Sequence, residues 1–292
     1  MQEPVRILAE GLGHPEGPDF LPDGGLVFAE TYMSRIGVWY EGRGVATYAG
    51  CGGGPNACML GSDGGVYITQ NGGTVGDWVA DVLGPPSIQK ASPDGKVEVI
   101  ATEIDGITLN APNDLSFGPD GRLYFTDSGV WDPATRPDPG YVFALAPDGS
   151  GEVLEELGNV YPNGICVEAD GSVVWVESYT RKVRRRRPDG SREELCELAE
   201  GHIPDGLKVA ENGDLWITSV TSGGFDIVSP DGGSVRFFET GGVPLNCVFR
   251  DASIYITDFG TFDTSGATSM VGRLVEAEAG VRGMPLFRGA IG

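Results

Sequence analysis

The stretch NAPNDLSFGPDGRLYFTD, residues 110–127, combines a Pro-Asn pair, a short apolar run, a Pro-Asp-Gly turn and a second β-rich run. Variants of this pattern recur along the whole chain at intervals of 39 to 57 residues. The acid or amide of the turn falls at Asp23, Asp63, Asp120, Asp170, Asn212 and Asp251. Self-similarity at such intervals is typical of a repeat fold, here with six units.

The turn chemistry indicates what each unit contains. Asp-Gly and Asn-Gly between β-rich runs supply the positive φ angles of tight hairpins. Further turns such as Pro93-Asp94-Gly95 lie between the first set, so each unit has two hairpins and four antiparallel strands. Since no segment shows a sustained 3.6-residue apolar period, helices should be nearly absent. The sequence predicts an all-β fold, a six-bladed β-propeller forming one domain over residues 1–292, with the strand Val5–Ala9 completing the last blade.

Composition narrows the possible partners and the compartment. The chain has 20 Lys and Arg against 42 Asp and Glu, a formal net charge of −22. Such a charge repels phosphate backbones and anionic lipids, so we expect neither nucleic-acid nor membrane binding. The N-terminus MQEPVRILAEGLG lacks the features of a secretory signal, and five cysteines without CxxC spacing favour reduced thiols. We therefore expect a cytoplasmic protein; its oligomeric state is not predicted.

A second regularity lies seven residues before the turns. In five units a proline is followed there by a carboxylate or carboxamide. The sixth unit has Asn246 five residues before Asp251, so its hairpin is shorter or its register has shifted. This position begins the innermost strand of a blade, so the side chains should converge in the central channel. Oxygen ligands of this kind suit Ca²⁺, Mg²⁺ or Mn²⁺ better than a thiolate zinc site. Pro-Asn and Pro-Asp are also ordinary loop chemistry, but five in register favour a central metal site. The five residues are Glu16, Asn56, Asn113, Asn163 and Asp205.

The chain resembles the senescence marker protein (regucalcin), gluconolactonase and luciferin-regenerating-enzyme family over nearly its whole length. The resemblance depends on Glu16-Gly17-Pro18, on NAPNDLSFGPDGRLYFTD from Asn110, on YPNGI from Tyr161 and on PDGLKVAENGDLWIT from Pro204. It implies a six-bladed propeller with one divalent cation in its channel. We expect calcium first, with magnesium, manganese, zinc or iron as alternatives.

The resemblance also implies roles for individual residues. Glu16, Asn163 and Asp205 match the metal ligands of the family, and Asn113 matches a residue that adds to the metal shell or touches substrate. We expect Asn113 and Asn56 to bind substrate. Family members that bind sugar acids carry an arginine at the position of Ala111, so the substrate pocket should differ here.

Many members of this family hydrolyse lactones of sugar acids. The resemblance therefore implies a divalent-metal-dependent lactonase, acting on a sugar acid lactone or that of a related small hydroxy acid. Asp205 is the predicted general base, because a carboxylate at the metal edge can accept a proton from the attacking water. Two alternatives stay open: hydrolysis of an organophosphate or other ester at the same metal site, and a non-enzymatic calcium-binding propeller.

Other features receive more modest predictions. The segments from Asn71 to Pro86, with Trp78, and from Ser128 to Gly140, with Trp131, should emerge on the metal face, where they form a lid or pack against neighbouring loops. His14 and His202 each precede a ligand loop and are either surface residues or a supporting shell. The basic run Arg184–Arg187 should be a solvated strand paired with local acids. Cys166 and Cys247 should lie in the core.

Overall fold

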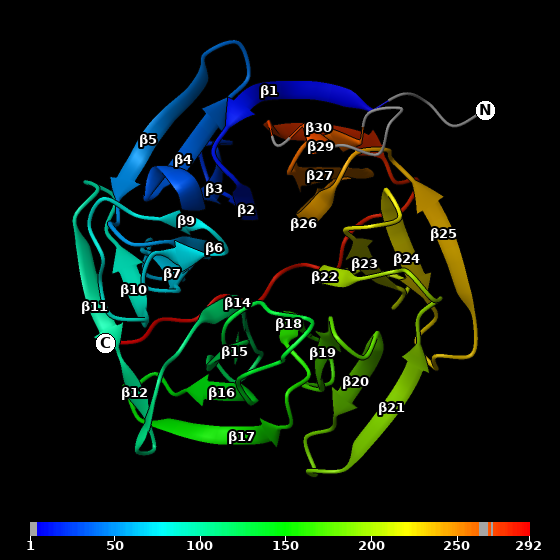
Figure 1. Cartoon of the computed structure of the whole chain (residues 1–292). Coiled ribbons are helices and arrows are strands. Elements are labelled where there is room, and N and C mark those ends of the chain that lie inside the picture. Colours follow the sequence, from blue (N-terminus) through cyan, green and yellow to red (C-terminus); the bar gives the residue numbers. More distant parts are fainter. Residues whose placement is uncertain (1–4, 263–267, 270) are drawn as a thin grey trace.

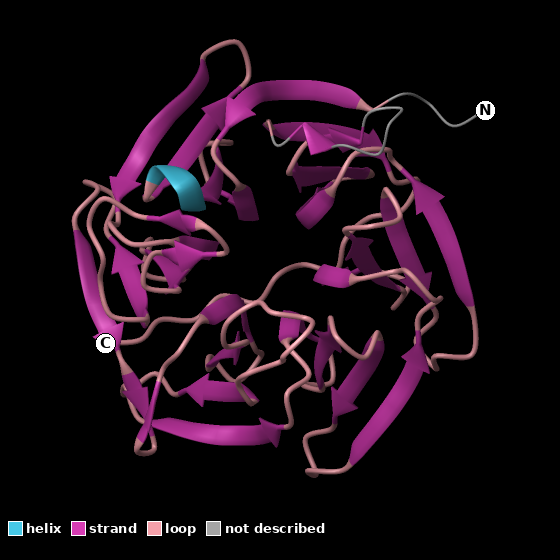
Figure 2. Cartoon of the chain, viewed as in Figure 1, coloured by secondary structure: helices cyan, strands magenta, loops and turns pink. Residues whose placement is uncertain are grey.

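The computed structural model describes residues 5–262, 268–269 and 271–292. Six four-stranded antiparallel sheets surround a central channel, as predicted (Figure 1). Within the described ranges the only helix is the 3₁₀ turn η1 (Thr31–Met33), and Figure 2 shows strands and loops elsewhere. No helix in these ranges is long and apolar enough to cross a membrane.

Each blade runs from an inner to an outer strand. Blade 1 consists of β2 (Pro15–Phe20), β3 (Leu26–Glu30), β4 (Arg35–Tyr40) and β5 (Gly44–Gly50). Blade 2 consists of β6 (Pro55–Leu60), β7 (Val66–Gln70), β10 (Ser87–Ala91) and β11 (Val97–Ala101). Blade 3 consists of β14 (Pro112–Phe117), β15 (Leu123–Asp127), β16 (Gly140–Leu145) and β17 (Gly151–Leu157).

The other three blades repeat this arrangement. Blade 4 consists of β18 (Pro162–Val167), β19 (Val173–Glu177), β20 (Lys182–Arg186) and β21 (Arg192–Glu197). Blade 5 consists of β22 (Pro204–Val209), β23 (Leu215–Ser219), β24 (Gly224–Val228) and β25 (Val235–Glu239). Blade 6 consists of β26 (Pro244–Arg250), β27 (Ser253–Asp258), β30 (Gly272–Glu278) and β1 (Arg6–Leu12). The N-terminal strand therefore completes the last blade, which confirms the prediction.

Three short hairpins lie outside the blades: β8 (Thr74–Val75) with β9 (Trp78–Val79), β12 (Glu103–Ile104) with β13 (Ile107–Thr108), and β28 (Thr261–Phe262) with β29 (Thr268–Ser269). The interval of 57 residues between the turns at Asp63 and Asp120 contains the long segment from Asn71 to Pro86. The β12–β13 hairpin between blades 2 and 3 accounts for part of that length and was not predicted.

Burial falls from the channel outwards because the inner strands are covered by neighbouring blades on both faces. All five residues of β3 are buried, whereas the outer strand β5 has one buried residue. The core consists of apolar clusters between blades, such as Val27, Ile36, Val66 and Ile68 between blades 1 and 2. Cys166 and Cys247 are buried in such clusters, as expected.

The predicted turns have the expected chemistry. The side chain of Asp23 accepts a hydrogen bond from the Gly25 N–H at 3.1 Å, and Asp120 accepts one from Arg122 at 3.1 Å. Gly24, which lies between Asp23 and Gly25 in the first turn, has a φ of 92°. An acid that bonds two residues ahead fixes the turn, and glycine relieves the strain of positive φ.

The basic run on β20 corrects one expectation. Arg184, Arg185 and Arg186 pair with acids as predicted, but Arg185 is only 4% exposed and is not solvated. Its guanidinium lies between Glu168 and Glu193 and also donates to the Pro230 carbonyl. A long strand-face side chain with paired charge can fill the space between two blades.

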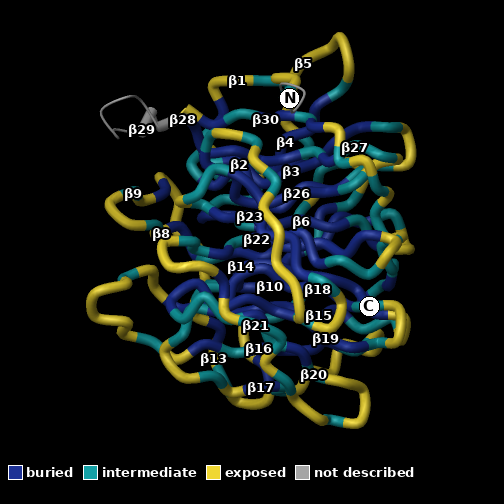
Figure 3. The backbone as a smooth tube through the Cα atoms, turned by 90° about the vertical axis from the view of Figure 1, so that its right-hand side faces the viewer, coloured by how far each residue is buried: buried dark blue, intermediate teal, exposed yellow. Residues whose placement is uncertain are grey.

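The C-terminal segment after β30 crosses the base of the channel (Figure 1). Met284 N–H donates to the Val209 carbonyl at 2.9 Å, and Ile291 N–H donates to the Tyr67 hydroxyl at 2.8 Å. Arg288 forms an ion pair with buried Asp19 of β2. The segment thus ties blade 5 to blades 1 and 2 on the side opposite the β8–β9 hairpin (Figure 3).

Arg288→Ala should lower the free energy of unfolding by about 2–3 kcal/mol, because it leaves the Asp19 carboxylate buried without its cation. Urea unfolding followed by circular dichroism measures this loss. Arg6→Ala, which removes a pair between largely exposed Arg6 and Glu41 side chains, is the control and should cost less than about 1 kcal/mol. Equal losses in both variants would show that the C-terminal segment does not depend on the ion pair.

Candidate functional site

The six inner strands begin at one level of the channel. Each starts with a proline that pairs with the last residue of the second strand in the same blade. In blades 5 and 6 these pairs are Pro204 with Ser219 and Pro244 with Asp258. The other pairs are Pro15 with Glu30, Pro55 with Gln70, Pro112 with Asp127 and Pro162 with Glu177. The residue after each proline therefore occupies an equivalent place, and these six residues are called the ring below.

The ring holds five of the predicted residues: Glu16, Asn56, Asn113, Asn163 and Asp205. Asn246 of the sixth blade is not a ring residue, and the shorter hairpin that its offset from the turn indicates is the reason. Because Pro244 pairs with Asp258, the ring residue of blade 6 is Leu245, and Asn246 lies one step further along β26. The N–H of Asn246 bonds the Thr257 hydroxyl, as that of Ala57 bonds Thr69. The β26–β27 hairpin turns through only two residues, which displaced the sequence register.

Contacts between ring side chains show that they converge. Asn56 Nδ2 donates to Asn113 Oδ1 at 3.1 Å and to the Asn113 carbonyl at 3.2 Å. Asn163 Nδ2 donates to Ser178 Oγ at 3.2 Å, and Asn163 lies near enough to Asp205 to lower the pKa of that carboxyl. Asp205 in turn lies near enough to Glu16 to raise the pKa of Glu16. Glu16, Asn113 and Asn163 are buried, whereas Asn56 and Asp205 keep partial access to solvent.

The backbone of the ring is held by neighbouring strands. Asp127 at the end of β15 accepts hydrogen bonds from the N–H groups of Asn110 and Ala111, at 2.8 and 2.7 Å, in the loop that leads to Asn113. Across the blade interface, the Thr126 hydroxyl donates to the Asn163 carbonyl at 2.6 Å. Equivalent acceptors in other blades are Glu30, Gln70 and Asp258. Ring positions are thus fixed before any ligand binds.

Electrostatics in the ring favour a cation. Burial raises the pKa of Glu16 well above its usual range, and the nearby charge of Asp205 raises it further. Burial and the charge of Asp114 likewise raise the pKa of Asp205, against a hydrogen bond from Asn163 that lowers it. Two carboxylates in one desolvated volume disfavour each other's charged form unless a positive charge joins them.

The donor set fits a hard divalent ion. Asn163 Oδ1 is buried and has no hydrogen-bond partner, although such atoms are normally satisfied. It lies on the same ring as the Glu16 and Asp205 carboxylates, so two anionic oxygen donors and one neutral donor are available. No three His, Cys, Asp or Glu side chains gather as a metal cluster in the described part of the chain.

Tyr161 is a site residue that the sequence analysis missed. It precedes Pro162 in blade 4 and has a φ of 54°, which is strained for a bulky residue. Burial raises the pKa of its phenol, as do the charges of Asp205 and Glu16, and its hydroxyl is hydrogen-bonded to Asn113. Tyr161 is the first residue of the YPNGI motif, in which only Asn163 was given a role by the sequence analysis.

The residues two positions before the ring form the mouth of the channel. They are His14, Gly54, Ala111, Tyr161, Ile203 and Val243. His14 packs against Phe259, with ring centroids 4.2 Å apart, and burial lowers its pKa to about 4, so it is neutral at pH 7. His202 lies elsewhere: its Nδ1 is 2.9 Å from Asp226 on β24, and its ring contacts Phe237 on the outer strand β25. These contacts place His202 away from the ring and favour the surface position over a supporting shell.

The two tryptophan loops lie on the ring side of the propeller, as predicted, because Trp78 contacts Tyr32, which packs on His14, and Trp131 contacts Tyr161. Figure 3 shows the β8–β9 hairpin of the first loop on the side opposite the C-terminus. Trp78 stacks with Tyr32 at a centroid distance of 5.0 Å and an interplanar angle of 26°. Trp131 packs against Tyr161 at 4.7 Å and against Tyr179 at 5.1 Å. Both tryptophans therefore join aromatic clusters at the mouth; a lid remains a prediction.

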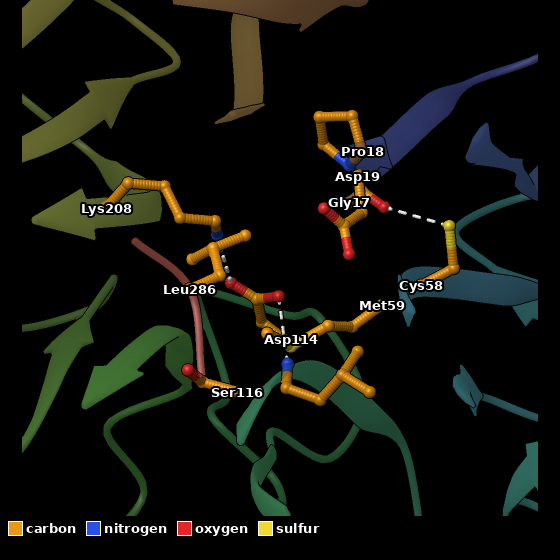
Figure 4. A pocket seen from close by; sticks show the side chains of 10 residues that line it. Gly17, Pro18, Asp19, Cys58, Met59, Asp114, Ser116, Lys208 and Leu286 are labelled. Carbon is orange, nitrogen blue, oxygen red and sulfur yellow. Dashed lines mark hydrogen bonds and ion pairs between the residues drawn. The ribbon is translucent and has the colours of Figure 1, made fainter. Parts of the chain in front are cut away.

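Beneath the ring the channel narrows to a small polar chamber (Figure 4). Lys208 Nζ lies there, 3.9 Å from Asp114 Oδ2, and donates to the Leu207 carbonyl and to Asn246 Oδ1. Burial by itself lowers the pKa of Lys208, but the charge of Asp114 and its neighbours outweighs this effect and raises it. Lys208 was not predicted as part of the site, because a lysine inside a propeller strand has no sequence signature. Its ammonium partly offsets the carboxylates above it.

Residues 14–259 match the family described as SMP-30/Gluconolactonase/LRE-like region. The chain belongs to this family. It is 26% identical to the gluconolactonase of Zymomonas mobilis over 286 residues, which cover 85% of this chain and 76% of that protein. The fold is also similar to a luciferin-regenerating enzyme, with a TM-score of 0.79, 18% identity and coverage of 98% and 99%. A calcium-binding regucalcin from Agrobacterium tumefaciens gives a TM-score of 0.77, 18% identity and coverage of 100% and 98%.

Asp127→Ala should lower the free energy of unfolding by about 2 kcal/mol, because the Asn110 and Ala111 N–H groups lose their acceptor. Asp127→Asn keeps one acceptor oxygen and should lose less. Asp148→Ala, in an exposed turn where Asp148 bonds Ser150, is the control and should lose clearly less stability than Asp127→Ala. Urea unfolding measures all three variants. An unchanged Asp127→Ala midpoint would mean that the loop before Asn113 is held by other contacts.

Proposed function

We propose that this protein is a divalent-metal-dependent hydrolase that opens the ring of a lactone. The observation that carries the proposal is the ring itself: two carboxylates, of which Asp205 raises the pKa of Glu16, and the unpartnered Asn163 Oδ1 on the same ring. Membership of the SMP-30/gluconolactonase family and the similarity to a gluconolactonase support lactone hydrolysis in particular.

Glu16, Asn163 and Asp205 would hold the ion, with calcium as the first candidate. When bound, a divalent cation polarises an ester carbonyl and makes a water molecule more acidic. The two carboxylates balance its charge, and the partner-free Asn163 oxygen completes a set of three protein donors. The remaining positions around the ion would be open towards the mouth.

The chain's own residues then have distinct tasks. Asp205 accepts the proton of the attacking water, because this residue keeps partial exposure to solvent whereas Glu16 is buried. The water oxygen bonds to the carbonyl carbon, the ring C–O bond breaks, and the released ring oxygen takes a proton. The product is a hydroxy acid, which loses a proton at neutral pH. Asn113, Asn56 and the Tyr161 hydroxyl would orient the lactone by hydrogen bonds.

A pH-stat assay of lactone hydrolysis, run on protein treated with a chelator and then resupplied with Ca²⁺, Mg²⁺, Mn²⁺ or Zn²⁺, tests the proposal. We expect hydrolysis to stop on chelation and to return with at least one ion. Hydrolysis of activated phosphotriesters but of no lactone would instead indicate an organophosphate hydrolase. Metal binding without any turnover would indicate a non-enzymatic propeller.

Glu16→Gln should weaken divalent-ion binding by at least about 10²-fold, because it removes an anionic donor from a desolvated site. Isothermal titration calorimetry measures the affinity, and circular dichroism checks that the blades remain folded. Asp148→Asn makes the same charge change in an exposed turn and should bind the ion as the wild type does. Equal affinity in Glu16→Gln and wild type would remove Glu16 from the ligand set.

Asp205→Asn should stay nearly inactive even when saturated with metal, because it lacks the proton acceptor as well as a charge. Loss of a general base costs about 10²- to 10⁴-fold in rate. Asn163→Ala should recover a measurable fraction of turnover at high metal, since it loses only a neutral donor. Acid release across a metal titration compares the two variants. Full recovery of Asp205→Asn would refute its role as base.

A further inference from the structure

The ring is interrupted by hydrocarbon at one place. Leu245 of blade 6 stands where the other five blades have a carboxylate or amide, and it is only 4% exposed. In the order of the blades it lies between Asp205 and Glu16, the two carboxylates. Leu245 is therefore the one apolar residue of the ring, and the two carboxylates lie on either side of it in blade order.

The apolar surface that begins at Leu245 continues towards the mouth. Leu245, Val243 and Phe259 form a buried cluster, against which Tyr32 of blade 1 and Val220 of blade 5 pack. These five residues are called the apolar sector. Tyr32 also stacks with Trp78, which extends the sector onto the β8–β9 hairpin. Blades 1, 5 and 6 thus contribute residues to one hydrophobic cluster next to the predicted metal ligands.

Backbone polar groups in this sector are already engaged. The N–H of Val243 donates to Asp258 Oδ2 at 3.1 Å, and the carbonyl of Leu245 accepts the Thr218 hydroxyl at 2.6 Å. Asp258 is also paired with Arg273 at 3.1 Å. Hydroxyl groups of a polyol placed against Leu245 and Val243 would lose water without gaining these backbone groups as partners, at a cost for each unsatisfied group. The polar side-chain groups at the edge of the sector are the unpartnered His14 Nδ1 and the Tyr32 hydroxyl.

The surface around the mouth has the same character. The loops that join second and third strands carry many of the large hydrophobic side chains exposed in the described part of the protein. They are Met33, Val79, Val82, Leu83, Val130, Trp131 and Val271. The protein as a whole has a net charge of −22, which disfavours anionic ligands. A neutral, apolar molecule fits both features.

We propose that the substrate lactone carries an apolar alkyl or aromatic substituent, which lies against the apolar sector while the ester carbonyl faces Glu16, Asn163 and Asp205. This inference rests on the proposed function and selects, among hydroxy acid lactones, those without a polyol chain. The sector acts by removing hydrocarbon from water, so its effect should grow with the area of the substituent.

The test compares six-membered lactones that share one ring: δ-valerolactone, a series with lengthening alkyl chains on the ring carbon next to the ring oxygen, and glucono-δ-lactone. Each kcat/KM is divided by the alkaline hydrolysis rate of the same lactone, which removes intrinsic reactivity. We expect about a threefold rise per methylene over the first few carbons. The best alkyl lactone should exceed glucono-δ-lactone by at least about tenfold.

Variants connect this preference to the sector. Leu245→Asn restores the amide of the other blades and should reduce the ratio of alkyl lactone to glucono-δ-lactone by about tenfold. Leu245→Ala removes hydrocarbon without adding a polar group and should lower the rise per methylene if the asparagine variant does not fold. Val235→Asn on the outer strand β25, an exposed site far from the mouth, is the control and should keep the wild-type ratio.

Three results would overturn the inference: a flat alkyl series, a preference for glucono-δ-lactone, or a ratio that Leu245 variants leave unchanged. If no lactone is hydrolysed with any metal, the proposed function fails instead. Calorimetric titration with the matching lactams, whose ring oxygen is replaced by N–H, then tests the sector alone. Tighter binding with each methylene would support the apolar site, and affinity independent of chain length would refute it.

Discussion

Closure of the propeller is the constraint on which the site depends. Six inner strands must start at one level around a narrow channel, and each does so at a proline held against the second strand of its blade. The side chains that follow these prolines therefore point into the channel. When two of them are carboxylates, as with Glu16 and Asp205, the fold itself forces like charges into a desolvated volume. A bound cation would offset the repulsion between these two carboxylates.

The charged groups in the rest of the channel are distributed unevenly on the two sides of the ring. The base of the channel is closed by the C-terminal segment, where Arg288 pairs with Asp19, and by Lys208 beside Asp114. These fixed positive charges lie below the ring, whereas the mouth above it is lined by uncharged groups such as neutral His14, Tyr161 and Val243. An ion or substrate therefore meets uncompensated negative charge from one side only.

Departures from sixfold symmetry are what make such a channel specific. A fully polar ring would bind a cation but would offer no preferred orientation to an organic ligand. Here Leu245 and the sector around it form one wall, and Tyr161 with Asn113 and Asn56 forms the other. A ligand with a polar ester and a hydrocarbon substituent can satisfy both walls at once. The long loops of blades 2 and 3 add aromatic surface above this boundary.

The sequence by itself determined the fold, the number of blades and five of the six ring residues, because turn chemistry and the Pro-Asn or Pro-Asp pairs are local signals with a regular interval. Only the tertiary structure decided the sixth position, since a two-residue turn in blade 6 moved the register and put Leu245, not Asn246, in the ring. Tyr161, Lys208 and the engagement of His202 by Asp226 were likewise decided in three dimensions. Their roles depend on which distant strands meet at the channel and which meet at the rim, and no local pattern encodes those distances.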